Sequence, residues 1–419
     1  MAKSVSLWRH YGFLLLWGGQ SISQLGSQVT RWALPLTAVL FLKATPFQMG
    51  LLLALGNLPS LLAGLLAGAW VDRVRRRPLL IVTDIGRALM LGSIPVAAWL
   101  GLLSMLQLYL IAFLTGILTV VFNVAYRSFL PSLVERDHLV EGNSKLGASE
   151  AVAGIVGPGL AGGLVQWLSG PTAILGDAFS FLVSALSLAL IRVQEKHLPE
   201  AQTPRHLWRE IGEGLSTVFH HPILRTLAGV SGLFNFFDSL LMTVYVLYLT
   251  QTIGISAAQV GIVFAVGGIG GLLGALLASR VTGRLGLGPA LLASVLLASV
   301  AELAIGVAGG PVLPGFLLVA IAEALVEAAT TLYSINGVSL RQAIVPIQLQ
   351  GRVNATMNVV AYGAIPLGAL LGGLLGGYGL RLTVLLAGGG VFLAFLWVLL
   401  SPVRHLHALP TEPDGIDSE

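Results

Sequence analysis

The stretch GAWVDRVRRRPLL, from Gly68 to Leu80, joins two long apolar segments through a short loop that carries four arginines within five residues. Short loops rich in lysine and arginine stay on the cytoplasmic side of a membrane. Of the 23 basic residues, 19 lie at the chain ends or in every second gap between apolar segments, and only Lys43 and Arg381 lie in the alternate gaps. This alternation predicts an all-α membrane protein that crosses the bilayer many times and keeps both termini in the cytoplasm.

The composition excludes an ordinary soluble protein. Hydrophobic residues make up 55% of the 419 residues and charged residues only 10%, whereas a soluble domain has roughly 25% charged residues. The basic residues lie beside apolar segments, where they set orientation and meet anionic lipid, so we expect no nucleic-acid partner. The chain has no cysteine, which excludes thiol chemistry and disulfides. We expect the first apolar run to be a retained helix rather than a cleaved signal.

A spanning helix needs about 20 mainly apolar residues. Twelve segments meet this requirement, at 11–41, 47–70, 78–103, 105–130, 145–168, 171–192, 223–251, 256–282, 287–308, 312–341, 352–377 and 381–402. They predict a six-helix bundle over 1–192, a cytoplasmic linker over 193–222, a second six-helix bundle over 223–402 and a disordered cytoplasmic tail over 403–419. Within the linker, WREIGEGLSTVF is expected to form an amphipathic helix on the membrane surface.

The two halves of the chain resemble each other. A shift of 211 residues places Pro78 on Pro289 and Asn143 on Asn354, and it aligns all six pairs of predicted helices. Parallel six-helix repeats are a known plan of transporters. The second, fifth, eighth and eleventh helices hold 22 of the 52 glycines. Small residues let helices approach closely in lipid, so we expect contacts between the second and eleventh helices and between the fifth and eighth. The alternative is that glycine is simply common in membrane helices.

The loop quoted above resembles the signature loop of the major facilitator superfamily, a glycine followed by an aspartate four residues later and a basic cluster. The matching positions are Gly68, Asp72, Arg73, Arg76 and Arg77, with Arg75 where the family usually has a glycine. The resemblance implies that Asp72 and the arginines form a charge latch at the cytoplasmic face, which holds the outward-open state. A plain positive-inside cluster is the alternative, and it would explain the arginines but not Asp72.

A second motif narrows the resemblance. GPGLAGG at 157–163 is similar to the GPxxGG motif of drug-proton antiporters in this superfamily, through Gly157, Pro158 and Gly162, with Ala161 in place of a glycine. TDIGRA at 83–88 and LPSLV at 130–134 resemble the branch with macrolide-efflux and enterobactin-exporter proteins. Residues 105–126 lack the arginine that many drug-proton antiporters carry in the fourth helix, which puts that particular proton relay in doubt.

Ionisable residues within apolar segments are costly in a bilayer and mark functional sites. Asp238 lies near the middle of the seventh helix, Glu323 and Glu327 share one face of the tenth, and Arg31 lies deep in the first. The resemblance implies that these helices line a central cavity. Burial disfavours a charged carboxylate and a nearby cation favours it, so Asp238 or Glu323 facing Arg31 would exchange a proton. The alternative is a static ion pair that fixes packing.

The remaining buried charges are given other roles. Asp84 and Arg87 are three residues apart and can pair at the inner end of the third helix. We expect this pair and Glu150 to belong to the cytoplasmic gate. Asp177 and Glu302 lie on helices that are peripheral in this superfamily, and capping or snorkelling to the interface is expected for both.

Polar and aromatic residues on the cavity-lining helices are candidates for substrate contact. Gln20, Gln24 and Gln28 recur every fourth residue and form one stripe, which points to water or to another helix. The further candidates are Asn57, Asn123, Tyr126, Asn235, Phe236 and Tyr245. With few charges among many apolar side chains, such a cavity suits a bulky amphipathic or lipophilic small molecule.

The sequence therefore favours a proton-coupled exporter of a drug, macrolide or siderophore type that works by alternating access, in a bacterial inner membrane and as a monomer. Its partners would be the small-molecule substrate, protons and membrane lipid. An importer or a lipid translocator of the same fold is the alternative. An intramembrane enzyme is disfavoured because no nucleophile cluster, phosphate-binding loop or metal-ligand spacing is visible, and neither a cofactor nor a metal is expected.

Overall fold

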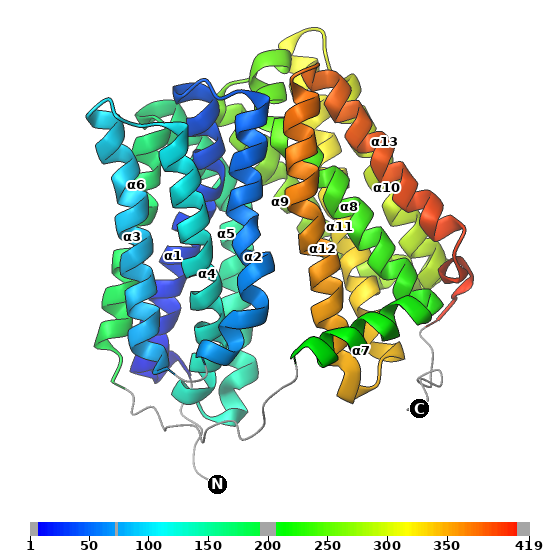
Figure 1. The fold of residues 1–419 in the computed structure, drawn as a ribbon, viewed down its shortest axis with the longest axis horizontal. Helices are drawn as coiled ribbons and strands as arrows, with labels where there is room; N and C mark the ends of the chain where they lie inside the picture. Colours follow the sequence, from blue (N-terminus) through cyan, green and yellow to red (C-terminus); the bar gives the residue numbers. More distant parts are fainter. Residues whose placement is uncertain (1–6, 72–73, 193–206, 409–419) are drawn as a thin grey trace. The chain divides into compact units, whose positions relative to one another are not determined.

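A computed structural model describes residues 7–71, 74–192 and 207–408 (Figure 1). A helix lies at each of the twelve predicted ranges, and a thirteenth lies in the linker. In chain order they are α1 (Tyr11–Leu36), α2 (Pro46–Val71), α3 (Arg76–Trp99), α4 (Met105–Leu133), α5 (Leu139–Leu168), α6 (Gly170–Leu190), α7 (Leu207–His220), α8 (Pro222–Leu247), α9 (Ala257–Leu285), α10 (Leu287–Val307), α11 (Val312–Ile344), α12 (Ile347–Gly376) and α13 (Leu380–Leu399).

Ten of these helices are long and apolar enough to cross a membrane, counted over the described residues. The first two, α1 and α2, are not among the ten. Three glutamines, three serines and Arg31 lower the hydropathy of α1. The count of twelve spans and the cytoplasmic position of both termini stay predictions. The predicted linker helix is confirmed as α7, whereas its position on a membrane surface stays a prediction.

The chain forms two compact units. The first comprises Met1–Ala44, Leu55–Ala201 and Ser256–Ala265, and the second comprises Thr45–Ala54, Gln202–Ile255 and Val266–Glu419. In the first unit α1 packs on α5 and α6, and α3 packs on α4 and α6. In the second unit α8 packs on α12 and α13, and α10 packs on α11 and α13. These are equivalent helix pairs under the shift of 211 residues, so the internal repeat in the sequence is confirmed by the packing.

The repeat also extends to details of the backbone. Thr45 and Gln48 form reciprocal side-chain to backbone hydrogen bonds at the start of α2, of 2.9 and 3.3 Å. Ser256 and Gln259, each 211 residues later, form the same capping box at the start of α9. A π-helical turn ends α1 (η2, Thr37–Phe41), and another ends α8 (η4, Tyr248–Ile253).

Both predicted glycine contacts between helices are confirmed. Within the first unit, a Cβ atom on Gly162 of α5 would lie 2.8 Å from the Cα atom of Gly261 in the first turns of α9. Within the second unit, a Cβ atom on Gly373 of α12 would lie 3.2 Å from the Cα atom of Gly50 near the start of α2. The backbones touch at these positions, and a larger residue would force them apart.

Residues just after α13 are ordered, contrary to the tail predicted from residue 403. A short 3₁₀ helix (η5, Pro402–His405) buries Val403, and the backbone N–H of Gly288 donates to the carbonyl of Leu406 at 2.7 Å. The chain after α13 thus returns to the start of α10. Residues 409–419 of the predicted tail lie outside the described residues.

Candidate functional site

A cavity of about 250 Å³ lies in the first unit, between α1, α3, α4 and α5. The glutamine stripe of α1 forms one wall, and α4 contributes Asn123 and Tyr126. Five of the predicted substrate-contact residues are thus brought together. Eleven of the thirteen lining residues are polar or charged, namely Gln20, Ser23, Gln24, Ser27, Gln28, Arg31, Arg87, Thr119, Asn123, Tyr126 and Glu150, and Phe122 and Ala153 complete the lining.

Several polar atoms around this cavity lack a partner. The Gln24 side-chain oxygen, the Tyr126 hydroxyl and the Arg87 Nε atom are buried, and none has a hydrogen-bond partner. Buried polar groups without partners are rare in folded proteins because each costs about 1–3 kcal/mol. Arg31 and Glu150, at the exposed part of the lining, bring one charge of each sign. The cavity therefore offers donors, acceptors and charge to a polar part of a ligand.

Asp84 and Arg87 form the predicted ion pair, but not at an end of the helix. Arg87 is the twelfth of the 24 residues of α3, so it lies in the middle of the helix. Its Nη2 atom donates to the Asp84 carboxylate, and both residues are buried, with 5% and 0% of their surface exposed. The expected position at the inner end of the helix is therefore wrong, whereas a role in gating stays a prediction.

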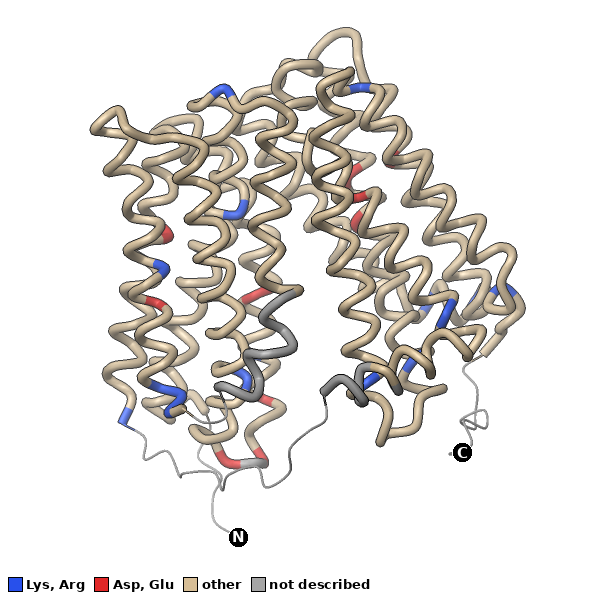
Figure 2. Tube along the Cα trace, viewed as in Figure 1, with Lys and Arg blue, Asp and Glu red and all other residues tan. Residues whose placement is uncertain are grey.

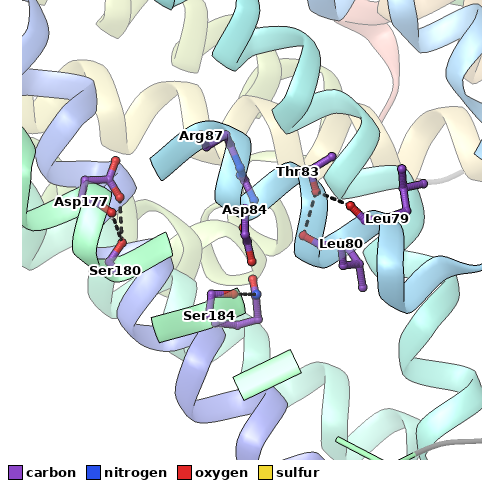
Figure 3. A network of polar contacts seen from close by, with 9 residues as sticks. Leu79, Leu80, Thr83, Asp84, Arg87, Asp177, Ser180 and Ser184 are labelled. Carbon is purple, nitrogen blue, oxygen red and sulfur yellow. Dashed lines mark hydrogen bonds and ion pairs between the residues drawn. The ribbon is translucent and has the colours of Figure 1, made fainter. Parts of the chain in front are cut away.

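Asp177 of α6 belongs to the same interior. It is 1% exposed, and the Ser180 hydroxyl donates to its Oδ1 atom at 2.8 Å. The strongest charges acting on it are Arg87 and Asp84. Figure 3 shows Asp84, Arg87, Asp177 and Ser180 on neighbouring turns of α3 and α6. Capping or snorkelling was expected for Asp177 and is wrong, because the side chain is enclosed in the middle of the unit.

The second unit also buries a carboxyl group, and the hydrogen-bond partner of this group is a tyrosine instead of an arginine. The Tyr245 hydroxyl donates to Oε2 of Glu323 at 2.7 Å, and these residues are 0% and 2% exposed. Asp238 is half-buried and Glu327 is exposed at the surface of the unit. Figure 2 shows acidic segments gathered inside the second unit, whereas its basic segments lie near helix ends. Arg31 belongs to the first unit, so its pairing with Asp238 or Glu323 stays a prediction.

Glu302 of α10 is the residue that the sequence interpretation missed. It is 0% exposed, and neither carboxyl oxygen has a hydrogen-bond partner. The strongest charges acting on it come from Asp238 and Glu323, both acidic. Snorkelling is therefore wrong here too. A carboxyl in a long apolar segment with no basic residue within two turns was the available signal (Ala290–Val307).

Other predicted contact residues lie away from the first cavity. Asn235 lines a separate cavity of about 290 Å³ in the second unit, formed mainly by apolar side chains of α8, α10 and α11. Tyr245 is enclosed and bonds Glu323, so its predicted place on a cavity wall is wrong. Phe236 packs edge-on against Phe237, and Asn57 of α2 is half-buried; neither lines the two cavities described.

Of the predicted gate, the structure describes the arginines after the loop. Arg76 Nη1 donates to the carbonyl of Ser128 in α4 at 3.0 Å, and Arg77 Nε donates to the carbonyl of Leu188 in α6 at 2.9 Å. Arg77 thus satisfies a carbonyl in the last turn of α6, where a cation also opposes the helix dipole. Asp72 and Arg73 lie outside the described residues, as does the side-chain environment of the Gly68 segment.

The motif of the fifth helix is a packing element. A Cβ atom on Gly157 would overlap the Gln28 side chain of α1, and the carbonyl of Pro158 faces Gly261. Among the described residues, no group of three or more histidine, aspartate or glutamate side chains is arranged to hold a metal ion.

Comparison with known proteins agrees with this architecture. The family model of the Major Facilitator Superfamily matches residues 16–242 and 227–416. The multidrug efflux pump Tap of Mycolicibacterium fortuitum is 31% identical over 333 residues, which cover 76% of this chain and 78% of Tap. The enterobactin exporter EntS of Citrobacter koseri is 25% identical over 382 residues, 88% of this chain and 87% of EntS.

Solved structures show the same fold at low sequence identity. A bacterial homologue of the iron transporter ferroportin, in an inward-facing state, superposes with a TM-score of 0.76 at 18% identity, over 94% of this chain and 99% of the homologue. The nucleoside transporter NupG superposes with a TM-score of 0.71 at 13% identity, over 93% of this chain and 98% of NupG.

Proposed function

Because the chain belongs to the major facilitator superfamily and is a multi-pass transporter of a bacterial membrane rather than an enzyme, we propose that it exports an amphipathic small molecule in exchange for protons. Two relatives, Tap and EntS, are named as exporters, which supports outward transport. Export against a gradient needs a second, downhill gradient, and the buried carboxyls of the second unit are groups able to carry a proton.

The proposed substrate site is the polar cavity of the first unit. Its glutamines, Asn123 and Tyr126 offer hydrogen bonds, and Phe122 offers an aromatic face. A substrate with a flat apolar part and a polar part fits this lining better than a purely lipophilic one. Many drugs, macrolides and siderophores likewise combine apolar and polar parts.

The observation that carries the proton coupling is the pair Glu302 and Glu323. Both are enclosed, and the strongest charges acting on either are carboxyl groups. An isolated carboxylate in a membrane interior is costly, which is why such groups mark proton pathways. We assign proton exchange to Glu323, which is held by Tyr245, together with Asp238 and Glu302, and a supporting role to Glu327.

The cytoplasmic latch remains part of the proposal. Arg76 and Arg77 are anchored to α4 and α6, and the proposal is that Asp72 acts together with this basic cluster. Asp72→Asn should therefore slow transport while the protein still folds.

The test uses purified protein in liposomes that are acidic inside, with valinomycin and equal potassium on both sides to hold the membrane potential at zero. Ethidium is a suitable probe because its permanent charge prevents trapping by the pH gradient alone. Wild type should accumulate ethidium, nigericin should release it, and Glu323→Gln should show no gradient-driven accumulation.

Glu141→Gln is the matched control, since Glu141 is 41% exposed and pairs with Lys145 at 3.5 Å near the start of α5. It should transport like wild type. Accumulation that ignores the pH gradient would contradict proton coupling. Wild-type flux of neither ethidium nor a macrolide, with folding intact, would favour an importer or a lipid translocator instead.

A further inference from the structure

The interior of the first unit holds two carboxyls and one guanidinium. Asp84, Arg87 and Asp177 are 0%, 5% and 1% exposed, and they act on one another electrostatically. With all three ionised the group would carry a net charge of −1 inside a membrane protein. Buried charges are tolerated when they are paired, and Arg87 can neutralise only one of the two carboxylates. The charge of the second carboxyl must therefore be neutralised in another way.

Aromatic packing holds the single cation in place. The Arg87 guanidinium lies 4.2 Å from the ring centroids of both Phe122 of α4 and Phe181 of α6. Such a sandwich stabilises the charged guanidinium and restricts its movement. Arg87 thus stays between α3, α4 and α6, where it bonds Asp84 and its charge also acts on Asp177.

Two atoms of the group have hydrogen-bonding capacity left over. Asp84 Oδ2 and Arg87 Nε are buried without a partner. In Figure 3 the Asp84 side chain points towards Ser184 of α6, whose hydroxyl accepts a hydrogen bond from Gln20 at 2.8 Å. A static ion pair is stable when its remaining donors and acceptors are satisfied. This one is incompletely satisfied, as expected of a group that changes its proton content.

The group also has a route to the cavity. Arg87 and Gln20 line the cavity, whereas Asp84 and Asp177 are buried and do not line it. Arg87, which bonds Asp84, connects the group to the cavity. The titratable and charged groups that share the cavity with Arg87 are Arg31 of α1, Tyr126 of α4 and Glu150 of α5. Arg31 and Glu150 are exposed and of opposite charge, so they leave the charge count of the interior unchanged.

We propose that Asp84, Arg87 and Asp177 form a second proton-binding site, in the first unit, which holds one exchangeable proton. The proton adds to a carboxylate oxygen of Asp84 or Asp177, and no other bond changes. The other carboxylate stays paired with Arg87. The inference rests on the proposed function only in its use for transport, because proton binding at this site can be measured without any substrate.

Infrared spectroscopy of the protein in liposomes measures this proton directly, since a protonated carboxyl has its own C=O stretching band. The band should lose intensity equivalent to one carboxyl in Asp177→Asn and equally in Asp84→Asn, because the remaining carboxylate then pairs with Arg87 and stays ionised. Arg87→Gln should instead gain intensity equivalent to one carboxyl, because both acids then need a proton. Arg87→Lys, which keeps the charge, should retain the wild-type intensity at neutral pH.

The carboxyl band should lose intensity in the aspartate variants and gain intensity in Arg87→Gln, and these opposite changes distinguish the proposal from a structural role. Thermal unfolding and gel filtration identify any variant that fails to fold, and Asp177→Asn is isosteric and keeps a group that Ser180 can bond. An unchanged carboxyl band in both Asp84→Asn and Asp177→Asn would overturn the proposal. Glu141→Gln should leave the band unchanged at neutral pH.

The two proposals can fail independently. Glu323→Gln tests the carboxyls of the second unit and leaves Asp84 and Asp177 intact. Suppose that the carboxyl band loses intensity in Asp84→Asn and Asp177→Asn, while ethidium transport by the wild type does not respond to the pH gradient. This result would support the proton site and overturn the proton-coupled function. Gradient-driven transport without the band changes would do the reverse.

Discussion

The two halves of the chain share one backbone plan, yet they bury different charges. Asp84, Arg87 and Asp177 of the first half correspond, 211 residues later, to Val295, Ala298 and Gly388. Conversely, Glu302 and Glu323 correspond to Leu91 and Ala112, both buried.

Each of these five residues thus has an apolar residue or glycine at the same place in the other half. Helix packing and capping are common to both halves, whereas each half has its own ionisable interior. The repeat therefore explains the fold, and the differences between the copies carry the function.

The largest effect on transport and stability is expected from a substitution that gives both halves the same residue at one equivalent position. Glu302→Leu places the residue of position 91 into α10 and removes a carboxyl without a hydrogen-bond partner. We expect loss of gradient-driven ethidium accumulation, together with an increase in the free energy of unfolding of about 1–3 kcal/mol, the cost of a buried polar group without a partner. Liposome flux and unfolding in mixed micelles measure the two effects. Retained transport with lower stability would mean that Glu302 serves packing alone.

The helix contacts give the next largest effect. Gly162→Ala places a Cβ atom 2.8 Å from the Cα atom of Gly261, so α5 and α9 must separate. Overpacking of this kind costs about 1–3 kcal/mol. Gly163→Ala is the matched control, because nothing lies within 4 Å of its Cβ position, and it should be neutral or slightly stabilising. Equal melting temperatures of the two variants would refute a tight contact at Gly162.

A smaller effect is expected from Tyr245→Phe, which removes one oxygen from a fully buried pair. Glu323 then loses the hydrogen bond of 2.7 Å that the tyrosine donates. We expect the free energy of unfolding to fall by about 1 kcal/mol, a typical net value for such a bond, and the pH dependence of transport to shift. Tyr248→Phe is a useful comparison, since that hydroxyl bonds backbone carbonyls instead and should leave the pH dependence unchanged.

The smallest effect on stability is expected at a turn that occurs at equivalent positions in both halves. Lys43 has φ of 55°, and the residue 211 positions later is Gly254 with φ of 81°. A left-handed conformation costs a non-glycine residue about 1–2 kcal/mol, partly offset by the greater freedom of glycine in the unfolded chain. Lys43→Gly should therefore stabilise the protein by less than about 1 kcal/mol, and Gly254→Ala should destabilise it by a similar amount. Thermal unfolding of both variants provides the measurement.

The helices were predictable because a membrane span is a local property of the sequence. Twenty apolar residues fix a helix without reference to the rest of the chain, and all twelve ranges contain one. Helix boundaries shifted by up to six residues where polar turns continue a helix, as at Leu139 of α5. The glutamine stripe was likewise predictable, because its spacing alone places three side chains on one face of α1.

The burial of each charged residue and the identity of its neighbours were not predictable in this way. Arg87 was assigned to a helix end, and Asp177 and Glu302 to the interface, because sequence position does not say which face of a helix is enclosed. That depends on which helices pack against α3, α6 and α10, and several of these neighbours, such as α6 for α3, α1 for α6 and α13 for α10, are distant in the sequence. The sequence by itself determined a repeated bundle of membrane helices, since hydrophobicity and charge bias act locally. Only the tertiary structure decided which ionisable groups meet, since burial and pairing arise when separate helices come together.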